Sequence, residues 1–281
     1  MIDCHTHLWR VGEHVGPYLL EEARRAWGMR PEQMDVSPER HREAVRGLSG
    51  AIVLGFHAPY MDVVVPNGYI ADYVRTDPDR LVGFASVNPV EPGAREELER
   101  CYHDLGLRGL KLGPIYQDYD PTDRAAFPVY EFAQQRQIPI LIHQATTFPS
   151  TGRLRYALPI LLDEVAIRFP ELKIVLAHLG HPWEADCVVT VRKHPNLYTD
   201  ISALHGRPWR FYQAMITAVE YGIGDKILFG SDFPFFTPEQ TAAGLRGVNA
   251  LAEGTALPRV PRELIEAILE RDAFQVLGLR D

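Results

Sequence analysis

Short apolar runs alternate along the chain with longer segments whose apolar residues recur every three or four positions. The short runs are apolar on both strand faces, which is typical of strands in a parallel sheet covered by helices. They predict eight strands, at residues 2–7, 51–55, 81–87, 109–112, 138–143, 172–178, 197–201 and 226–232.

The segments between these strands predict helices, because their apolar residues fall on one helical face. Helices are expected at residues 21–27, 38–48, 67–76, 93–105, 124–135, 158–169, 185–193, 210–221, 238–252 and 262–277. Eight strand–helix units in 281 residues predict an α/β fold, a closed (β/α)₈ TIM barrel that forms a single domain over residues 1–281. A doubly wound open sheet is the alternative, and it is disfavoured because no Gly-rich turn follows the first strand.

Composition narrows the range of partners. The chain is 46% hydrophobic and 23% charged, as in ordinary globular proteins. Its net charge of -8, without a Lys/Arg cluster, argues against a nucleic-acid partner. The sequence has no recognisable signal peptide and no apolar run long enough to span a bilayer, so no membrane partner is expected. Three scattered cysteines suit a reducing compartment, and we expect a cytoplasmic location.

Polar residues stand at the ends of several predicted strands. Alternate residues of a strand share a face, so His5 and His7 should point the same way, together with Asp3 and opposite to Cys4. In a barrel, the carboxyl ends of the strands meet at one mouth, where barrel enzymes place their chemistry. Five strand-end residues should therefore converge there: His5, His7, His143, His178 and Asp232. Four imidazoles and a carboxylate are good donors for a metal such as zinc.

Five stretches together resemble the amidohydrolase superfamily, and within it the amidohydrolase 2 group related to aminocarboxymuconate-semialdehyde decarboxylase. They occur in the family's order between residues 2 and 234. As a set they are specific for the superfamily and much less specific for the reaction. The stretches are Ile2-Asp3-Cys4-His5-Thr6-His7, Gly109-Leu110-Lys111-Leu112, Ile140-Leu141-Ile142-His143, Ala177-His178-Leu179-Gly180 and Gly230-Ser231-Asp232-Phe233-Pro234.

The resemblance implies a role for each matching residue. His5, His7, His143 and Asp232 correspond to the ligands of one divalent metal ion, for which zinc is the first choice and manganese the second. His178 would stay off the metal and polarise the substrate or move a proton. Asp232 would also act as a catalytic base, taking a proton from a water that the metal activates.

Lys111 leaves two alternatives open. In two-metal amidohydrolases a lysine on the fourth strand is carboxylated and bridges the metals, and His178 would then bind the second ion. The Gly109–Leu112 stretch resembles the one-metal group instead, in which the lysine helps to bind an anionic substrate. A buried lysine paired with an acid such as Asp3 would be a purely structural role.

Other residues that follow the predicted strands are candidates for contact with a small-molecule substrate. Trp9 follows the first strand, and it could equally anchor a loop. Arg153 suits a carboxylate, although a solvated loop charge is the ordinary role of such a residue. The complete set of candidate contacts is Lys111, Trp9, His57, Tyr116, Arg153 and His181.

Two reactions fit this set of residues. We expect hydrolysis of a small lactone, ester or amide, with metal-dependent non-oxidative decarboxylation of a small aromatic or unsaturated acid as the alternative. Decarboxylation is disfavoured because related decarboxylases hold a carboxylate with an arginine, and none in the long loop after His7 can be aligned to that role. A degenerate barrel that only binds ligands would lack a metal ligand, and none is missing. Barrels of this family often pair, so a homodimer is a further option.

Overall fold

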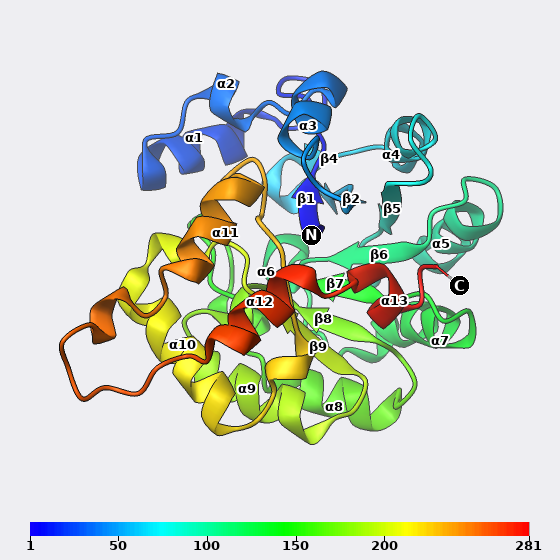
Figure 1. Ribbon diagram of the computed structural model, residues 1–281. Coiled ribbons are helices and arrows are strands. Elements are labelled where there is room, and N and C mark those ends of the chain that lie inside the picture. The colour runs from blue at the N-terminus through cyan, green and yellow to red at the C-terminus, as the bar shows by residue number, and fades with distance from the viewer. Residues whose placement is uncertain (281) are drawn as a thin grey trace.

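The computed structural model describes residues 1–280, and its core is a parallel eight-stranded barrel (Figure 1). Around the barrel the strands follow the order β1-β2-β5-β6-β7-β8-β9-β10. They are β1 (Ile2–His7), β2 (Gly50–Leu54), β5 (Leu81–Ser86), β6 (Gly109–Leu112), β7 (Ile140–Ile142), β8 (Ile174–Leu176), β9 (Leu197–Asp200) and β10 (Ile227–Leu228). The predicted TIM barrel is therefore confirmed, with all eight strands in the expected places.

Main-chain hydrogen bonds close the barrel between β1 and the segment that begins with β10. The amide of Cys4 donates to the carbonyl of Phe229 at 2.9 Å, and the amide of Asp232 donates to the carbonyl of His5 at 2.8 Å. Because β1 also pairs with β2 on its other side, its backbone is held from both directions. The first and last strands of the chain are thus neighbours.

One feature of β1 differs from simple alternation. The β1–β2 register passes from Asp3 opposite Ala51 to Thr6 opposite Val53, so β1 contains one extra residue, which is a β-bulge. Cys4 belongs to the buried cluster of inward-facing strand residues that also contains Phe84 and Val175. The predicted opposition of Cys4 to His5 is therefore wrong, because the bulge turns both side chains inward.

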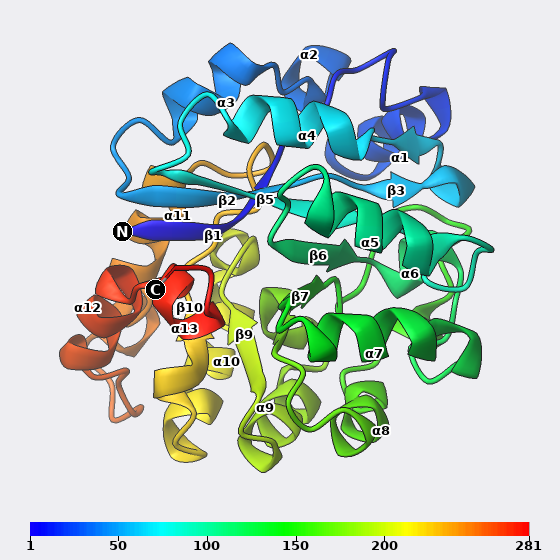
Figure 2. The same ribbon diagram turned by 90° about the vertical axis from the view of Figure 1, so that its right-hand side faces the viewer.

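Helices surround the barrel, and Figure 2 shows the strands from the side, with the chain's N-terminus and α13 at one end and α1, β3 and α6 at the other. The main outer helices are α3 (Pro38–Ala44), α4 (Asn67–Val74), α5 (Ala94–His103), α7 (Phe127–Gln135), α8 (Leu161–Arg168), α9 (Glu184–Lys193), α10 (Pro208–Glu220), α11 (Pro238–Arg246) and α12 (Arg262–Glu270). None of the helices within residues 1–280 is long and apolar enough to cross a membrane.

The predicted helix at residues 262–277 is two helices. After α12, the Asp272 side chain accepts a hydrogen bond from the amide of Gln275 and so caps a new helix, α13 (Ala273–Leu277). The change of direction places Phe274 and Leu277 in the inner cluster of strand residues. This short helix therefore plugs the end of the barrel opposite the mouth.

The long loop after β1 contains more structure than predicted. It holds α1 (Pro17–Trp27), which starts at a proline and ends at Gly28 in the left-handed conformation, and the short α2 (Pro31–Met34). Two further unpredicted elements are a small hairpin of β3 (His57–Ala58) and β4 (Val63–Val64), and α6 (Pro114–Gln117) after β6. All of these lie at the carboxyl end of the barrel (Figure 2).

Candidate active site

Three donor atoms from the two ends of the chain converge at the mouth of the barrel. The carboxylate Oδ1 of Asp232 lies 3.3 Å from His5 Nε2 and 3.3 Å from His7 Nε2. These atoms all lie within 4.8 Å of one another, and the three residues are buried. Two imidazole nitrogens and one carboxylate oxygen are the donor set that zinc and similar divalent ions take, so the residues present fit a metal ion.

Asp200, at the end of β9, orients this group from behind. Its Oδ2 lies 2.9 Å from His5 Nδ1, which fixes the proton on that nitrogen and leaves Nε2 unprotonated, as a metal ligand must be. Burial alone would raise the pKa of Asp200, but the neighbouring His5 and His178 hold it well below its usual range. We had not singled out Asp200, although it ends a predicted strand as the other site residues do.

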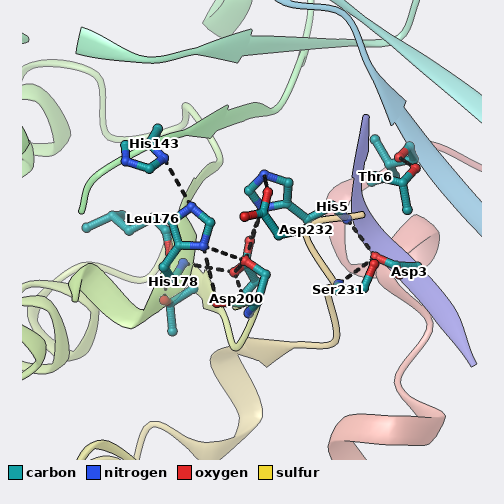
Figure 3. Close-up of polar contacts among 12 residues, drawn as sticks. Asp3, His5, Thr6, His143, Leu176, His178, Asp200, Ser231 and Asp232 are labelled. Carbon is teal, nitrogen blue, oxygen red and sulfur yellow. Dashed lines mark hydrogen bonds and ion pairs between the residues drawn. The ribbon is translucent and has the colours of Figure 1, made fainter. Parts of the chain in front are cut away.

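His178 and His143 face each other on the β7–β8 side of the site (Figure 3). His178 Nε2 lies 3.0 Å from His143 Nδ1, and His178 Nδ1 lies 2.8 Å from the Ser202 hydroxyl. The other ring nitrogen of His143 lies 3.1 Å from the carbonyl of Thr146. Burial lowers the pKa of both histidines to about 3, so both rings are neutral at pH 7.

Of the four expected metal ligands, the structure brings His5, His7 and Asp232 into one compact group but leaves His143 beside it. Both nitrogens of His143 already have partners, in His178 and Thr146, which explains its position. A metal role for His143 therefore stays a prediction.

The backbone is unusual at the two residues expected to handle protons. Asp232 and His178 have φ angles of 64° and 61°, in the left-handed region that non-glycine residues seldom occupy. Strained residues of this kind cluster at functional sites, where the surrounding structure holds them in place. Here the Asp232 amide is held by the carbonyl of His5, and the His178 amide by the Asp200 carboxylate.

Lys111 reaches the same group from β6. Its Nζ lies 3.1 Å from His5 Nε2, and burial lowers the pKa of Lys111 to about 8. The lysine therefore contacts His5, and not Asp3 as in the structural alternative. Asp3 instead accepts hydrogen bonds from the amides of His5 and Ser231, at 3.0 Å each, and ties β1 to the segment after β10.

A cavity of about 690 Å³ opens above these residues. Trp9 stacks on His7 with 4.6 Å between ring centroids, and its indole donates to the carbonyl of Met34 at 2.6 Å. Tyr116 meets the His143 ring edge-on at 4.8 Å. The predicted site residues that line this cavity are His7, Trp9, Lys111, Tyr116, His143, His178, His181 and Asp232.

Two predicted substrate contacts do not line this cavity, and a substrate role for them stays a prediction. His57 lies on the small hairpin, where its Nε2 is 3.1 Å from Glu91, and it lines a separate cavity of about 390 Å³. Arg153 forms a partly exposed ion pair with Asp118. Each side chain thus pairs with a nearby acid outside the main cavity.

Two arginines that we did not predict do line the cavity. Arg207, in the loop after β9, is exposed, and within residues 1–280 its guanidinium forms no hydrogen bond or ion pair. Arg40, from α3, lies over the ring of Phe233 at 5.4 Å and donates to the carbonyl of Gln33 at 3.1 Å. A position shortly after a strand was the available signal for Arg207, and Arg40 offered none, because it lies within a helix.

Comparisons with known proteins agree with this architecture. A family model described as amidohydrolase matches residues 2–279. A gamma-resorcylate decarboxylase from a Polaromonas species is 24% identical over 268 residues, covering 74% of this chain and 79% of that protein. A 2-amino-3-carboxymuconate-6-semialdehyde decarboxylase from Dictyostelium discoideum is 27% identical over 244 residues, covering 76% of this chain but only 65% of that protein.

Solved structures resemble the whole chain. A TIM-barrel protein from Bordetella bronchiseptica superposes with a TM-score of 0.73 at 22% identity, covering 99% of both chains. A dihydroxybenzoic acid decarboxylase from a Polaromonas species, solved with manganese and 2-nitroresorcinol, gives a TM-score of 0.69 at 19% identity, covering 99% of this chain and 98% of that one. These likenesses support the fold.

Proposed function

Because the chain belongs to the amidohydrolase family, whose model matches residues 2–279, we propose that it is a metal-dependent decarboxylase of a small aromatic or unsaturated carboxylic acid. The observation that carries the proposal is Arg207, a cavity-lining arginine without an acidic partner among residues 1–280. The sequence disfavoured decarboxylation because no arginine in the loop after His7 could be aligned, and Arg207 offers a guanidinium from a different loop. Both sequence relatives named above are decarboxylases, which also supports the proposal.

His5, His7 and Asp232 would hold the divalent ion, with His143 proposed as a fourth ligand. Zinc is the proposed metal and manganese the alternative, the latter supported by the Polaromonas structure that contains it. When bound, the ion would orient substrate oxygens and stabilise negative charge that develops on them. Asp200 would keep His5 in the tautomer that this role needs.

In decarboxylation, the bond between the carboxylate and its carbon breaks, carbon dioxide leaves, and the electron pair stays on that carbon. A proton must then be added to the same carbon. Asp232 lines the cavity and is the proposed proton carrier. His178, neutral at pH 7, would hydrogen-bond the substrate. Arg207 would hold a carboxylate, since a guanidinium matches its planar geometry.

Hydrolysis is the second candidate, and the surroundings of Asp232 suit it as well. Oδ1 of Asp232 contacts both His5 and His7, whereas its Oδ2 has no hydrogen-bond partner within residues 1–280. A carboxylate oxygen that is free in this way can accept a proton from an attacking water. The same aspartate therefore serves either reaction, and the substrate decides between them.

The test is an assay of the purified protein, loaded with zinc or with manganese, on both substrate classes. 2,6-Dihydroxybenzoate and related aromatic acids would be followed by release of carbon dioxide, and a panel of lactones by ring opening. We expect carbon dioxide from at least one aromatic acid and no lactone hydrolysis. Lactone hydrolysis without carbon dioxide release would establish the second candidate instead. Protein treated with a chelator serves as the control for metal dependence.

A further inference from the structure

Helix α1 lies at the mouth of the barrel and is tied to the loop that follows β7. The hydroxyl of Tyr18 lies 2.7 Å from that of Thr151, and the amide of Ser150 donates to the carboxylate of Glu22 at 2.6 Å. Residues of α1 line one side of the main cavity, among them Leu19 and Trp27. The segment therefore covers the site without belonging to the barrel wall.

Three aromatic side chains from three separate loops meet at this cover. Trp27 lies 4.6 Å from Phe148, at 50°, and 5.2 Å from Phe235, at 82°, between ring centroids. We call Trp27, Phe148 and Phe235 the aromatic wall, and all three line the main cavity. The loops that carry them follow β1, β7 and β10, so the contact exists only in the folded chain.

Trp27 is unusual because 46% of its surface remains exposed although it packs against two phenylalanines. A large aromatic side chain that stays accessible at a cavity mouth is typical of a ligand-binding surface. Deeper in the same cavity, Trp9 continues the aromatic lining, 6.5 Å from Phe235 and stacked on His7. A ligand that reaches His7 therefore passes along aromatic faces and edges.

We propose that the aromatic wall selects ligands with a flat, conjugated ring over saturated ones of equal size and charge. The inference rests on the proposed function, which supplies the carboxylate group of the ligand, and adds a preference for the kind of ring that carries it. Offset or edge-on contacts between aromatic rings add about 0.5–1.5 kcal/mol beyond burial of area, which corresponds to roughly 2- to 12-fold in affinity. A saturated ring gains only the free energy that comes from burying its apolar area. If the wall merely anchored α1, its loss would weaken both kinds of ligand equally.

Benzoate and cyclohexanecarboxylate test this directly, because they share charge and ring size and differ in planarity. Their dissociation constants would be measured calorimetrically on the metal-loaded protein. The unmodified protein should bind benzoate about 3- to 10-fold more tightly. The preference should fall in Trp27→Leu, which keeps Phe148, Phe235 and Trp9, and should fall less in Trp27→Phe. Trp209→Leu is the matched control, since Trp209 is 53% exposed on α10 and does not line the cavity.

An unchanged benzoate preference in Trp27→Leu would overturn the inference. An equal loss of affinity for both ligands would also overturn the inference, because it would mean that Trp27 only anchors α1. Circular dichroism of each variant verifies that α1 and the barrel are retained. Binding is measured without turnover, so this experiment and the carbon dioxide assay can fail separately. A benzoate preference that depends on Trp27, in a protein that releases no carbon dioxide from any aromatic acid, would contradict the proposed reaction but support the role of the aromatic wall.

Discussion

The floor of the cavity and its mouth are built in different ways. On the floor, His5 is held by strands on both sides and contacts Asp200, Lys111 and Asp232 through its ring. At the mouth, Arg207 is exposed and forms no ion pair within residues 1–280. The floor is thus fixed by hydrogen bonds across the barrel. The mouth is formed by loops, which meet in contacts such as that of Trp27 with Phe148.

This difference indicates which parts of the molecule determine the chemistry and which determine ligand selectivity. Strand ends place a group within a few tenths of an ångström, as a metal site requires. Loops carried by the same scaffold change readily, and they decide which ligand fits. Substitutions on the floor should therefore abolish turnover or metal binding, and substitutions at the mouth should change ligand affinity.

The largest effect is expected for Asp232→Asn. The amide cannot carry a proton as the carboxylate does, so turnover should fall roughly 10³-fold, within the range of general acid–base catalysis. Steady-state kinetics on whichever substrate class proves active measures it. Asp118→Asn is the matched control, because Asp118 also has a positive φ angle, of 54°, but lies outside the cavity. Activity retained in Asp232→Asn would remove Asp232 from the chemistry.

Asp200→Asn should weaken metal binding about 10- to 100-fold, since His5 loses the carboxylate that orients its ring. Competition with a coloured chelator measures the affinity. Asp163→Asn provides the comparison, because Asp163 bonds His194 at 2.6 Å in a similar way but outside the site. Equal metal affinity in the two variants would show that the floor does not need Asp200.

The pH dependence of stability should reveal His41, a fully buried residue of α3. Its ring lies 2.8 Å from the hydroxyls of Tyr73 and Thr6, the latter between His5 and His7. Burial lowers the pKa of His41 from 6.5 to about 3, so the unfolded chain takes up this proton first as the pH falls. The contribution of His41 is complete above pH 6.5 and decreases by about 1.4 kcal/mol per pH unit below it.

Between pH 6.5 and pH 5 this amounts to about 2 kcal/mol of unfolding free energy. Urea unfolding at both values should show a smaller loss in His41→Gln than in the unmodified protein. His103→Gln, at an exposed position at the end of α5, should behave like the unmodified protein. The same loss in all three proteins would mean that His41 takes up its proton without unfolding.

The smallest effect is expected at the mouth. Arg207→Gln should raise the KM for an aromatic acid about 10-fold, the value of one exposed charge-assisted contact, and should change kcat little. Arg192→Gln, another exposed arginine that does not line the cavity, should leave KM unchanged. A large loss of kcat in Arg207→Gln would place Arg207 with the floor, and so break the distinction between the two regions.

The sequence predicted the floor far better than the mouth, for a physical reason. Strands such as Ile174–Leu176 are short apolar runs, and the strand ends must meet at one mouth once the barrel closes. Asp200 was accessible to the same argument and was overlooked. The bulge in β1 was not accessible, because it depends on the register with β2 and not on a local pattern.

The mouth could not be predicted in the same way. No periodicity or spacing indicates that Trp27 meets Phe148 and Phe235, because these contacts depend on the course of three loops. The positions of His57 and Arg153 outside the main cavity have a related cause. A charged or titratable side chain just after a strand turns toward the nearest acid, here Glu91 or Asp118, and the identity of that acid is set by tertiary structure.

The seam between β1 and β10 also sets the order of events when the protein is made. Asp3 and Ser231 meet although 228 positions separate them, and the three clustered donors come from the same two ends of the chain. The ribosome must therefore deliver Asp232 before His5 and His7 can share an ion with it. Metal uptake by the proposed site would be a late step, after nearly all of the barrel has been synthesised, and a chain that stops before β10 cannot assemble the three donors.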